Sequence, residues 1–160
     1  MSDRPYLPLL RALRAGGVHH AIAGGLAVVL HGVPRMTFDL DLVVDLSDDN
    51  MKRLVDVLAH EGYRPRLPLP LQELHDRNKR IEWTTQRNLI AFSVHHPQRV
   101  MEEVDLLLAP GVEWSSVASS LVERQINGDK VFVIGKALLR QMKLATGRAK
   151  DKADAELLGD

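Results

Sequence analysis

Hydrophobic positions along the chain follow two periods, one typical of helices and one typical of strands. Apolar residues three or four apart predict helices over residues 6–15, 26–30, 48–60 and 136–154, the last interrupted at Gly147. Short apolar or alternating runs predict strands over residues 17–23, 38–44, 81–85, 89–95 and 104–108. Residues 125–134, with Asn127-Gly128 at their centre, predict a hairpin. The pattern indicates an α/β (α+β) fold with a mixed central sheet flanked by helices.

Two further segments are less regular. Residues 64–70 carry three prolines and cannot form a regular helix. The stretch that follows, to about residue 79, is expected to be either a short helix or a loop beside the functional site. Ser47 is a plausible N-cap for the helix over residues 48–60, and Gly62 ends that helix.

Length and composition set the scale of the molecule. The chain has 160 residues with 45% hydrophobic content, enough for one sizeable core and a single domain over residues 1–160. Its main part is expected over about residues 17–110, with a C-terminal hairpin and helices over about 121–158. The 21 basic and 21 acidic residues cancel, which argues against a broad basic surface for nucleic acid.

Several chemistries are excluded or disfavoured by composition. The chain has no cysteine, so it has no disulfide, thiol nucleophile or cysteine-ligated zinc. It also has no signal-like N-terminus and no long apolar run, so a cytoplasmic protein without a membrane partner is expected.

Two aspartates on an expected strand are the first candidate functional group. On an extended chain Asp39 and Asp41 point to the same side, about 7 Å apart along the backbone. Such a pair can bracket metal ions about 3.5–4 Å apart. The alternative is a solvated strand face at a sheet edge.

A glycine pair lies about fourteen residues upstream of the acidic strand. Gly24 and Gly25 form an expected tight turn that opens a helix. A turn of this kind offers backbone N–H groups to an anion, and the missing Cβ atoms let a phosphate approach. Alone, the pair is more often only a turn. Followed by Arg35, Thr37 and the acidic strand, it predicts a site that holds phosphate and divalent metal together.

These residues together resemble the signature of the polymerase-beta-like nucleotidyltransferase superfamily. The matching positions are Gly24, Gly25, Ala27, His31, Gly32, Arg35, Thr37, Asp39 and Asp41. Within it, the chain is most similar to small prokaryotic proteins related to the minimal nucleotidyltransferases and to nucleotidyltransferase-type toxins and antitoxins. The resemblance implies a nucleotidyltransferase-like fold.

The resemblance also implies a third carboxylate on a later strand. Asp105 fits the family pattern of an acid followed by an apolar run, and Glu103 is the competing candidate. Asp39, Asp41 and Asp105 would then be catalytic and would hold two Mg²⁺ ions, or Mn²⁺ in their place. Asp105 would also help to deprotonate the acceptor hydroxyl.

A basic helix near the C-terminus supplies a candidate for nucleotide binding. Lys136, Arg140 and Lys143 form one stripe on it. Lys143 is the position that aligns with the family, and a solvated basic face is the alternative for all three. Arg148, Asp151 and Asp154 are expected to pair among themselves around the break at Gly147. The nucleotide-binding set implied by the resemblance is Gly24, Gly25, Arg35, Thr37 and Lys143.

The function expected on this basis is transfer of a nucleoside monophosphate from a nucleoside triphosphate such as ATP. The acceptor would be a hydroxyl of RNA or of a partner protein, within a toxin–antitoxin system. The alternative is a weak or inactive antitoxin-like module that binds a partner protein. The sequence names neither the acceptor nor the preferred base.

Overall fold

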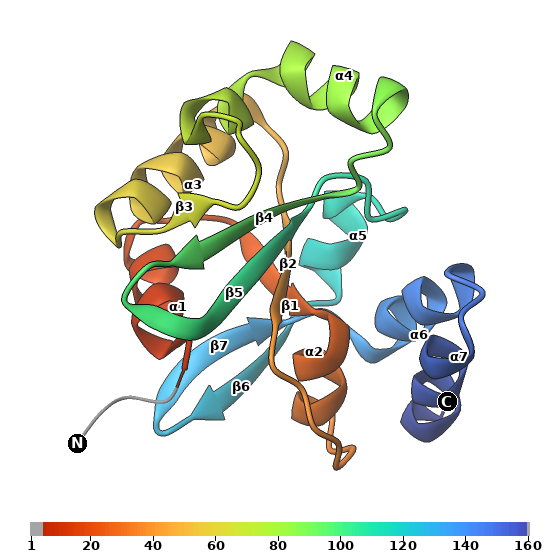
Figure 1. The fold of residues 1–160 in the computed structure, drawn as a ribbon. Helices are drawn as coiled ribbons and strands as arrows, with labels where there is room; N and C mark the ends of the chain where they lie inside the picture. Colours follow the sequence, from red (N-terminus) through yellow and green to blue (C-terminus); the bar gives the residue numbers. More distant parts are fainter. Residues whose placement is uncertain (1–4, 160) are drawn as a thin grey trace.

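The computed structural model describes residues 5–159 and arranges them around a seven-stranded mixed sheet (Figure 1). The strands are β1 (His20–Ala23), β2 (Leu40–Val44), β3 (Arg64–Pro65), β4 (Ala91–His96), β5 (Arg99–Leu107), β6 (Val122–Ile126) and β7 (Asp129–Val133). The helices are α1 (Leu7–Ala15), α2 (Gly24–Leu30), α3 (Asp48–His60), the short 3-10 helix η1 (Leu71–His75), α4 (Arg77–Gln86), α5 (Trp114–Ser119), α6 (Lys136–Ala145) and α7 (Ala149–Leu158). Residues 1–4 and 160 of the expected domain lie outside the described part. The expected fold class, a mixed sheet flanked by helices, is confirmed.

The order of the strands places β2 at the centre of the sheet. The order is β3-β4-β5-β2-β1-β7-β6, and β2 pairs antiparallel with β1 and parallel with β5. In this register Asp41 lies opposite Ala23 on one side and opposite Asp105 on the other. The end of β1, the glycine turn after it and two carboxylates therefore meet at one place.

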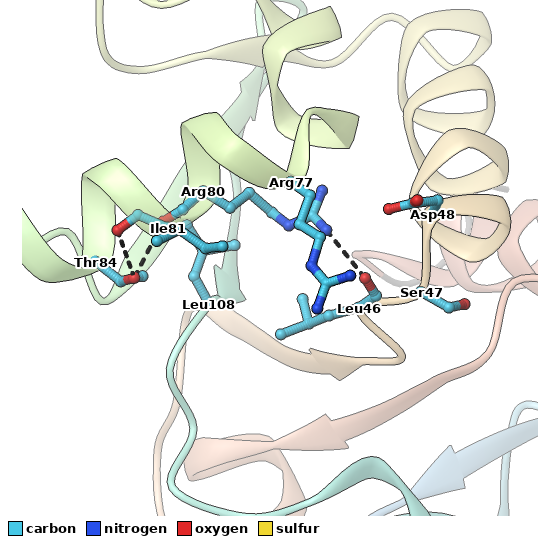
Figure 2. Close-up of a pocket in the computed structure, with 8 residues that line it drawn as sticks. All are labelled: Leu46, Ser47, Asp48, Arg77, Arg80, Ile81, Thr84 and Leu108. Atoms are coloured by element: carbon cyan, nitrogen blue, oxygen red, sulfur yellow. Dashed lines mark hydrogen bonds between the residues drawn. The ribbon is translucent and has the colours of Figure 1, made fainter.

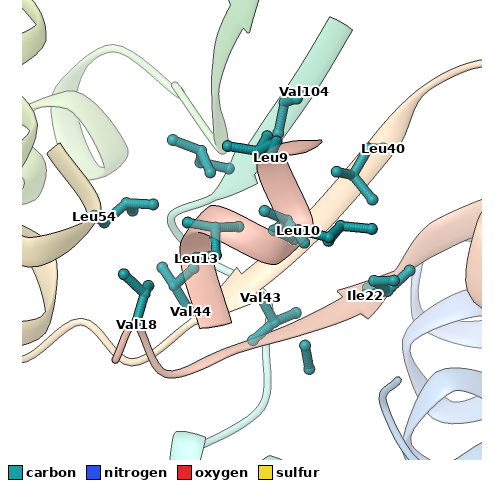
Figure 3. Close-up of a cluster of buried hydrophobic side chains, with 14 of the residues drawn as sticks. Leu9, Leu10, Leu13, Val18, Ile22, Leu40, Val43, Val44, Leu54 and Val104 are labelled. Atoms are coloured by element: carbon teal, nitrogen blue, oxygen red, sulfur yellow. The ribbon is translucent and has the colours of Figure 1, made fainter. Parts of the chain in front are cut away.

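The hydrophobic core fixes this arrangement from the opposite face of the sheet. Leu40 and Leu42 of β2 are fully buried, and leucines of α1 and α3 lie against the same layer (Figure 3). Leu9 and Leu13 on α1 are each 0% exposed. Each such side chain contributes roughly 1.5–3 kcal/mol on burial. Because the side chains of a strand alternate, packing of the leucines on this face turns Asp41 toward the other one.

The C-terminal helices lie on the side of the sheet to which Asp41 points. In Figure 1, α2, α6 and α7 stand together, away from α1 and α3. The break between α6 and α7 falls at Gly147, which has a φ of 72° and so takes a conformation favourable for glycine. The expected single segment is thus two helices, separated where the sequence predicted an interruption.

The hairpin predicted from Asn127-Gly128 is confirmed. These two residues connect β6 to β7 and have φ values of 50° and 85°. Two positive φ values are what a two-residue turn needs to match the right-handed twist of its strands.

The strand expected over residues 81–85 is wrong, because this segment is part of helix α4. Asp76 caps α4 by accepting hydrogen bonds from the backbone N–H groups of Asn78 and Lys79. Trp83 is 1% exposed whereas Ile81 is 51% exposed. The two apolar residues therefore do not share a face, and the apparent alternation was misleading.

Further details of the elements also differ from the expected ones. β5 begins at Arg99 instead of 104, and α5 had not been expected. β2 begins at Leu40, so Asp39 precedes the strand. The N-cap Ser47 of α3 makes no side-chain capping hydrogen bond. Within residues 5–159, no helix combines the length and apolarity needed to cross a membrane.

Candidate active site

Asp41 and Asp105 form the centre of the candidate active site. They are paired residues on the adjacent parallel strands β2 and β5, and both are partly buried. Burial and, after it, the negative charge of Asp105 together raise the pKa of Asp41 to about 6. Ser93, opposite Asp105 on β4, donates a hydrogen bond of 2.5 Å from Oγ to its Oδ1. The site thus holds two carboxylates that repel one another.

Glu103, the competing candidate for the third carboxylate, is paired with an arginine, although its charge still acts on Asp39. Its Oε1 forms an ion pair of 3.1 Å with Nε of Arg66. Asp105, by contrast, has Asp41 as its partner in the sheet. The geometry therefore favours Asp105 over Glu103 as the carboxylate that accompanies Asp41.

Asp39 is close to this pair but does not form a closed cluster with it. Its side chain is largely exposed. The partial burial of its carboxyl group raises its pKa, and the negative charge of Asp105 adds to this effect. In the part of the chain that the structure describes, no three His, Asp or Glu side chains converge closely enough to hold a metal ion. Asp39 lies just before β2 and so outside the expected strand, but it lines the same cavity as Asp41 and Asp105.

The donor set nevertheless fits a divalent cation. Carboxylate oxygens are the hard ligands that Mg²⁺ takes, usually with only one or two carboxylates and with oxygens from phosphate. Among residues 5–159, no Lys or Arg forms an ion pair with Asp39, Asp41 or Asp105. A cation would relieve the repulsion that raises the pKa of Asp41, and rotation of the exposed Asp39 side chain would bring a third ligand.

The two glycines are required by close packing around the carboxylates. Gly24 has a φ of +62°, and a Cβ there would lie 1.8 Å from Oδ2 of Asp41. A Cβ on Gly25 would lie 2.7 Å from Oγ1 of Thr37. The sequence predicted these glycines as a turn before a helix that begins at Leu26, with the approach of a phosphate as their reason, whereas α2 begins at Gly24 itself. Gly25 also lines the cavity described below.

Gly24→Ala is expected to reduce nucleotidyl transfer roughly a hundredfold, the effect of displacing a reacting group by about 1 Å. The added methyl group would push Asp41 aside. Gly32→Ala is the matched control, since Gly32 has a φ of +98° and open space around it. Both variants bear a backbone cost of about 1–2 kcal/mol. Steady-state transfer rates and melting curves compare them, and equal loss of activity in both would refute the packing argument.

Lys143 lies in a network of charges between α6 and α7. Its Nζ is 3.2 Å from Oδ1 of Asp151 and 3.1 Å from Oδ2 of Asp154, and its side chain is only 11% exposed. Asp151 also accepts hydrogen bonds of 2.7 Å from Thr146 and Arg148. These bonds to Thr146, Lys143 and Arg148 outweigh burial and lower the pKa of Asp151.

Arg35 joins the same network from the segment before β2. It forms an ion pair with Asp154, so it links the loop that carries Thr37 and Asp39 to α7. The expected pairing of Asp151 and Asp154 with Arg148 is therefore incomplete, because Lys143 and Arg35 are their further partners. Lys136 and Arg140 lie away from the site, beside another surface depression.

These groups line one cavity of about 440 Å³. Its walls are formed by Gly25, Arg35, Met36, Thr37, Phe38, Asp39, Asp41, Asp105, Lys143, Arg148, Lys150 and Asp151. A second cavity, of about 310 Å³, shares Asp41, Asp105 and Lys143 with the first and extends over Leu107 and Met142. The expected site residues thus come together, and Gly24 lines the second cavity. Two linked spaces beside the carboxylates can accept two reactants.

A separate cavity of about 520 Å³ lies on the other face of the sheet, under α4 (Figure 2). Arg80 is 6% exposed there and donates hydrogen bonds of 2.8 Å to the carbonyl of Leu74 and 3.0 Å to that of Leu46. Arg77 lies beside it. The lining includes none of the expected site residues, so Arg80 is a structural link between α4 and the end of β2.

Arg80→Met is expected to lower the free energy of unfolding by about 1–3 kcal/mol, because two carbonyl groups lose their donor. The matched control is Arg77→Met: Arg77 is exposed and has no hydrogen bond or ion pair within the described residues. Its replacement should change stability by less than about 0.5 kcal/mol. Urea unfolding curves measure both, and comparable losses would contradict this role of Arg80.

Two site residues escaped the sequence analysis. Ser93 contacts Asp105 from β4, twelve residues earlier in the chain, and its polar side chain gives no special signal. Tyr6, at the start of α1, contacts the backbone beside Asp39, and its pattern suggested only a helix residue. Both contacts depend on strand order, which the sequence pattern does not specify.

Solved structures with the same fold include enzymes that modify antibiotics. The antibiotic-resistance factor ANT(2'')-Ia superposes with a TM-score of 0.60 at 16% identity, over 94% of this chain and 78% of that one. The lincosamide antibiotic adenylyltransferase LnuA, bound to lincomycin, gives 0.59 at 13%, over 99% and 96%. A nucleotidyltransferase-like protein from Paracoccidioides brasiliensis gives 0.57 at 19%, over 94% and 70%. At these identities the likeness shows the fold, which is that of nucleotidyltransferases.

A family model decides the assignment. Comparison with curated proteins gave no match. The model for aminoglycoside-2''-adenylyltransferase, however, matches residues 7–158, nearly the whole chain. The polymerase-beta-like superfamily expected from the sequence is thereby confirmed, and so is the expectation of a nucleotidyltransferase enzyme. The chain belongs to the aminoglycoside-2''-adenylyltransferase family of nucleotidyltransferases.

Proposed function

We propose that this enzyme transfers AMP from ATP to a hydroxyl group of a small polar molecule of the aminoglycoside kind. The observation that carries the proposal is the pair of carboxylates, Asp41 and Asp105, between two linked cavities. The choice of ATP follows from the adenylyltransferase family. The dependence on a metal and the roles of the site residues, both expected from the sequence, are part of this proposal.

Asp41 and Asp105 would bind the metal, with Asp39 as the third ligand. Divalent ions supply two things here: they polarise the α-phosphate and they stabilise the oxygens that attack and leave. The three carboxylates contribute negative charge, and within residues 5–159 none of them forms an ion pair with Lys or Arg. Two Mg²⁺ ions, or Mn²⁺, suit this all-oxygen set.

The basic wall of the larger cavity would bind the triphosphate. Lys143, Arg148 and Lys150 line it together with Arg35, and Gly25 and Thr37 also line it, beside Arg35. Lys143 is held in place by Asp151 and Asp154. A preorganised cation of this kind neutralises charge that develops on the leaving pyrophosphate.

Asp105 would take the proton of the acceptor hydroxyl. Its Oδ1 already accepts a hydrogen bond from Ser93, which fixes the orientation of the carboxylate and leaves Oδ2 for the acceptor. The acceptor oxygen would attack the α-phosphorus, the bond to pyrophosphate would break, and AMP would remain on the acceptor.

A small acceptor is favoured by the relatives and by the size of the site. ANT(2'')-Ia is described in complex with adenylyl-2''-tobramycin, and LnuA with lincomycin. The cavities beside the carboxylates are about 440 and 310 Å³, and the formal net charge is zero. These features do not support the RNA or protein acceptor that the sequence suggested. The toxin–antitoxin context stays a prediction.

An acceptor panel tests this function. Purified protein is incubated with Mg²⁺ and α-phosphate-labelled ATP, and with tobramycin, lincomycin, bulk transfer RNA or a protein extract in parallel. The expected result is label on one of the two antibiotics, lost on addition of EDTA and absent with Asp105→Asn. Label confined to the RNA or protein fraction would overturn the small-acceptor proposal.

A further inference from the structure

Tyr6 connects the first helix to the backbone beside the site. It is 6% exposed, and its hydroxyl donates a hydrogen bond of 2.5 Å to the carbonyl of Phe38. The same hydroxyl accepts one of 3.1 Å from the backbone N–H of Glu103. The carbonyls of Met101 and Glu103 lie 3.3 and 3.0 Å from the hydroxyl as well. The hydroxyl therefore bridges the backbone of the two segments that carry the carboxylates.

This bridge lies where the pairing of β2 and β5 has not yet begun. The first paired residues are Leu40 and Val104. Residues 33–39 before β2 have no regular secondary structure, so Asp39 has no strand ladder to hold it. The Tyr6 hydroxyl supplies the connection between the two segments at this point. The peptide group that it fixes is the one between Phe38 and Asp39.

Tyr6 is itself held firmly. Its backbone N–H donates 2.7 Å to Oε1 of Glu102, which is 5% exposed, and Tyr63 donates 2.8 Å to the other oxygen of that carboxylate. Tyr6 also has a φ of 71°, an uncommon conformation for a residue with a side chain. Burial raises the pKa of Tyr6 to about 12, so at neutral pH the hydroxyl keeps the proton that it donates.

We propose that Tyr6 is a positioning residue for the metal site, acting through the Phe38 peptide to set the direction of the Asp39 carboxylate. Asp39 is the exposed member of the three carboxylates and lies outside the strand. Asp41 and Asp105 are fixed by the sheet, whereas Asp39 depends on the hydroxyl of a residue far away in the sequence. This inference rests on the proposed role of Asp39 as a metal ligand.

Binding of Mn²⁺ tests the role of Tyr6 without relying on turnover. Titration followed by electron paramagnetic resonance, with a non-hydrolysable ATP analogue present, gives the apparent Kd of the wild type, Tyr6→Phe and Tyr63→Phe. Tyr6→Phe keeps the buried ring and removes the hydroxyl, and it is expected to weaken Mn²⁺ binding about fivefold to tenfold. Tyr63→Phe removes a hydroxyl from the same Glu102 network but not from the Asp39 segment, so its Kd should stay within about twofold of the wild type.

A double-mutant cycle separates positioning from general loosening. If Tyr6 acts through Asp39, Tyr6→Phe should have almost no further effect on the Kd in an Asp39→Asn background. Equal weakening in both backgrounds, or equal weakening by Tyr63→Phe, would overturn the inference. An unchanged Kd in Tyr6→Phe would do the same. Failure of the wild type to bind Mn²⁺ would instead count against the proposed metal site as a whole, and melting curves confirm that each variant is folded.

Discussion

Asp41→Asn is expected to lower AMP transfer by about a thousandfold or more, because it removes a charge at the centre of the site that we propose binds the metal. Asn has the same shape but loses the charge that would hold the cation beside Asp105. The measurement is single-turnover transfer from labelled ATP at saturating Mg²⁺. Glu103→Gln is the matched control, since Glu103 is on the same strand as Asp105 but pairs with Arg66. Its activity should stay within about threefold of the wild type.

The same substitution should stabilise the metal-free protein. Burial and the charge of Asp105 raise the pKa of Asp41 to about 6, so its ionised form is unfavourable in the folded state. A raised carboxyl pKa means that stability is lost as the pH rises through the folded value. At pH 8 in EDTA, Asp41→Asn should therefore melt at a higher temperature than the wild type. If the variant were both less stable and inactive, the loss of activity would be due to misfolding and not to the loss of a metal ligand.

Lys143→Ala has the second large expected effect, on both stability and transfer. The ammonium group joins Asp151 and Asp154, and the three side chains are 11%, 5% and 7% exposed. Its removal should cost about 3 kcal/mol, the low end for a broken buried ion pair, because Arg35 and Arg148 still contact the two carboxylates. Transfer should fall roughly a hundredfold as the phosphates lose a cation.

Arg140→Ala is the control for this prediction. Arg140 is another cation of α6, but its Nε donates 3.3 Å to the carbonyl of Ala155 and it does not line the cavity of the carboxylates. Its loss should cost less than about 1 kcal/mol and leave transfer within about twofold. Urea unfolding gives the stability of both variants, and the labelled-ATP assay gives their rates. Full activity in Lys143→Ala would contradict the role assigned to Lys143.

Local signals in the sequence were sufficient for much of the fold and for the outline of the site. The turn at Asn127-Gly128 needs positive φ values, and asparagine and glycine are the residues that adopt them most readily, so the dipeptide predicts the turn. The glycine pair and the spaced aspartates were recognisable because each is defined within a few residues. Segment 81–85 failed because its apparent alternation competed with a helix cap at Asp76, which decides the structure of the whole segment.

The relations between distant segments were not accessible in this way. The contact between Tyr6 and Phe38 spans 32 positions, and it exists only because the start of α1 lies beside the residues before β2 and the middle of β5. The ion pair between Arg35 and Asp154 is a second example, because Arg35 lies in a loop 119 positions earlier in the chain. A pattern of residues identifies candidate groups, but strand order and helix packing choose which of them meet.

The most direct test of the account is a crystal structure with Mn²⁺ and a non-hydrolysable ATP analogue. We expect anomalous signal from Mn²⁺ between Asp41 and Asp105, with the triphosphate in the cavity lined by Gly25 and Lys143. Rotation of Asp39 toward the metal would complete the ligand set. A nucleotide bound elsewhere, for example in the cavity beneath α4, with no metal at the two aspartates, would contradict the assignment of the active site.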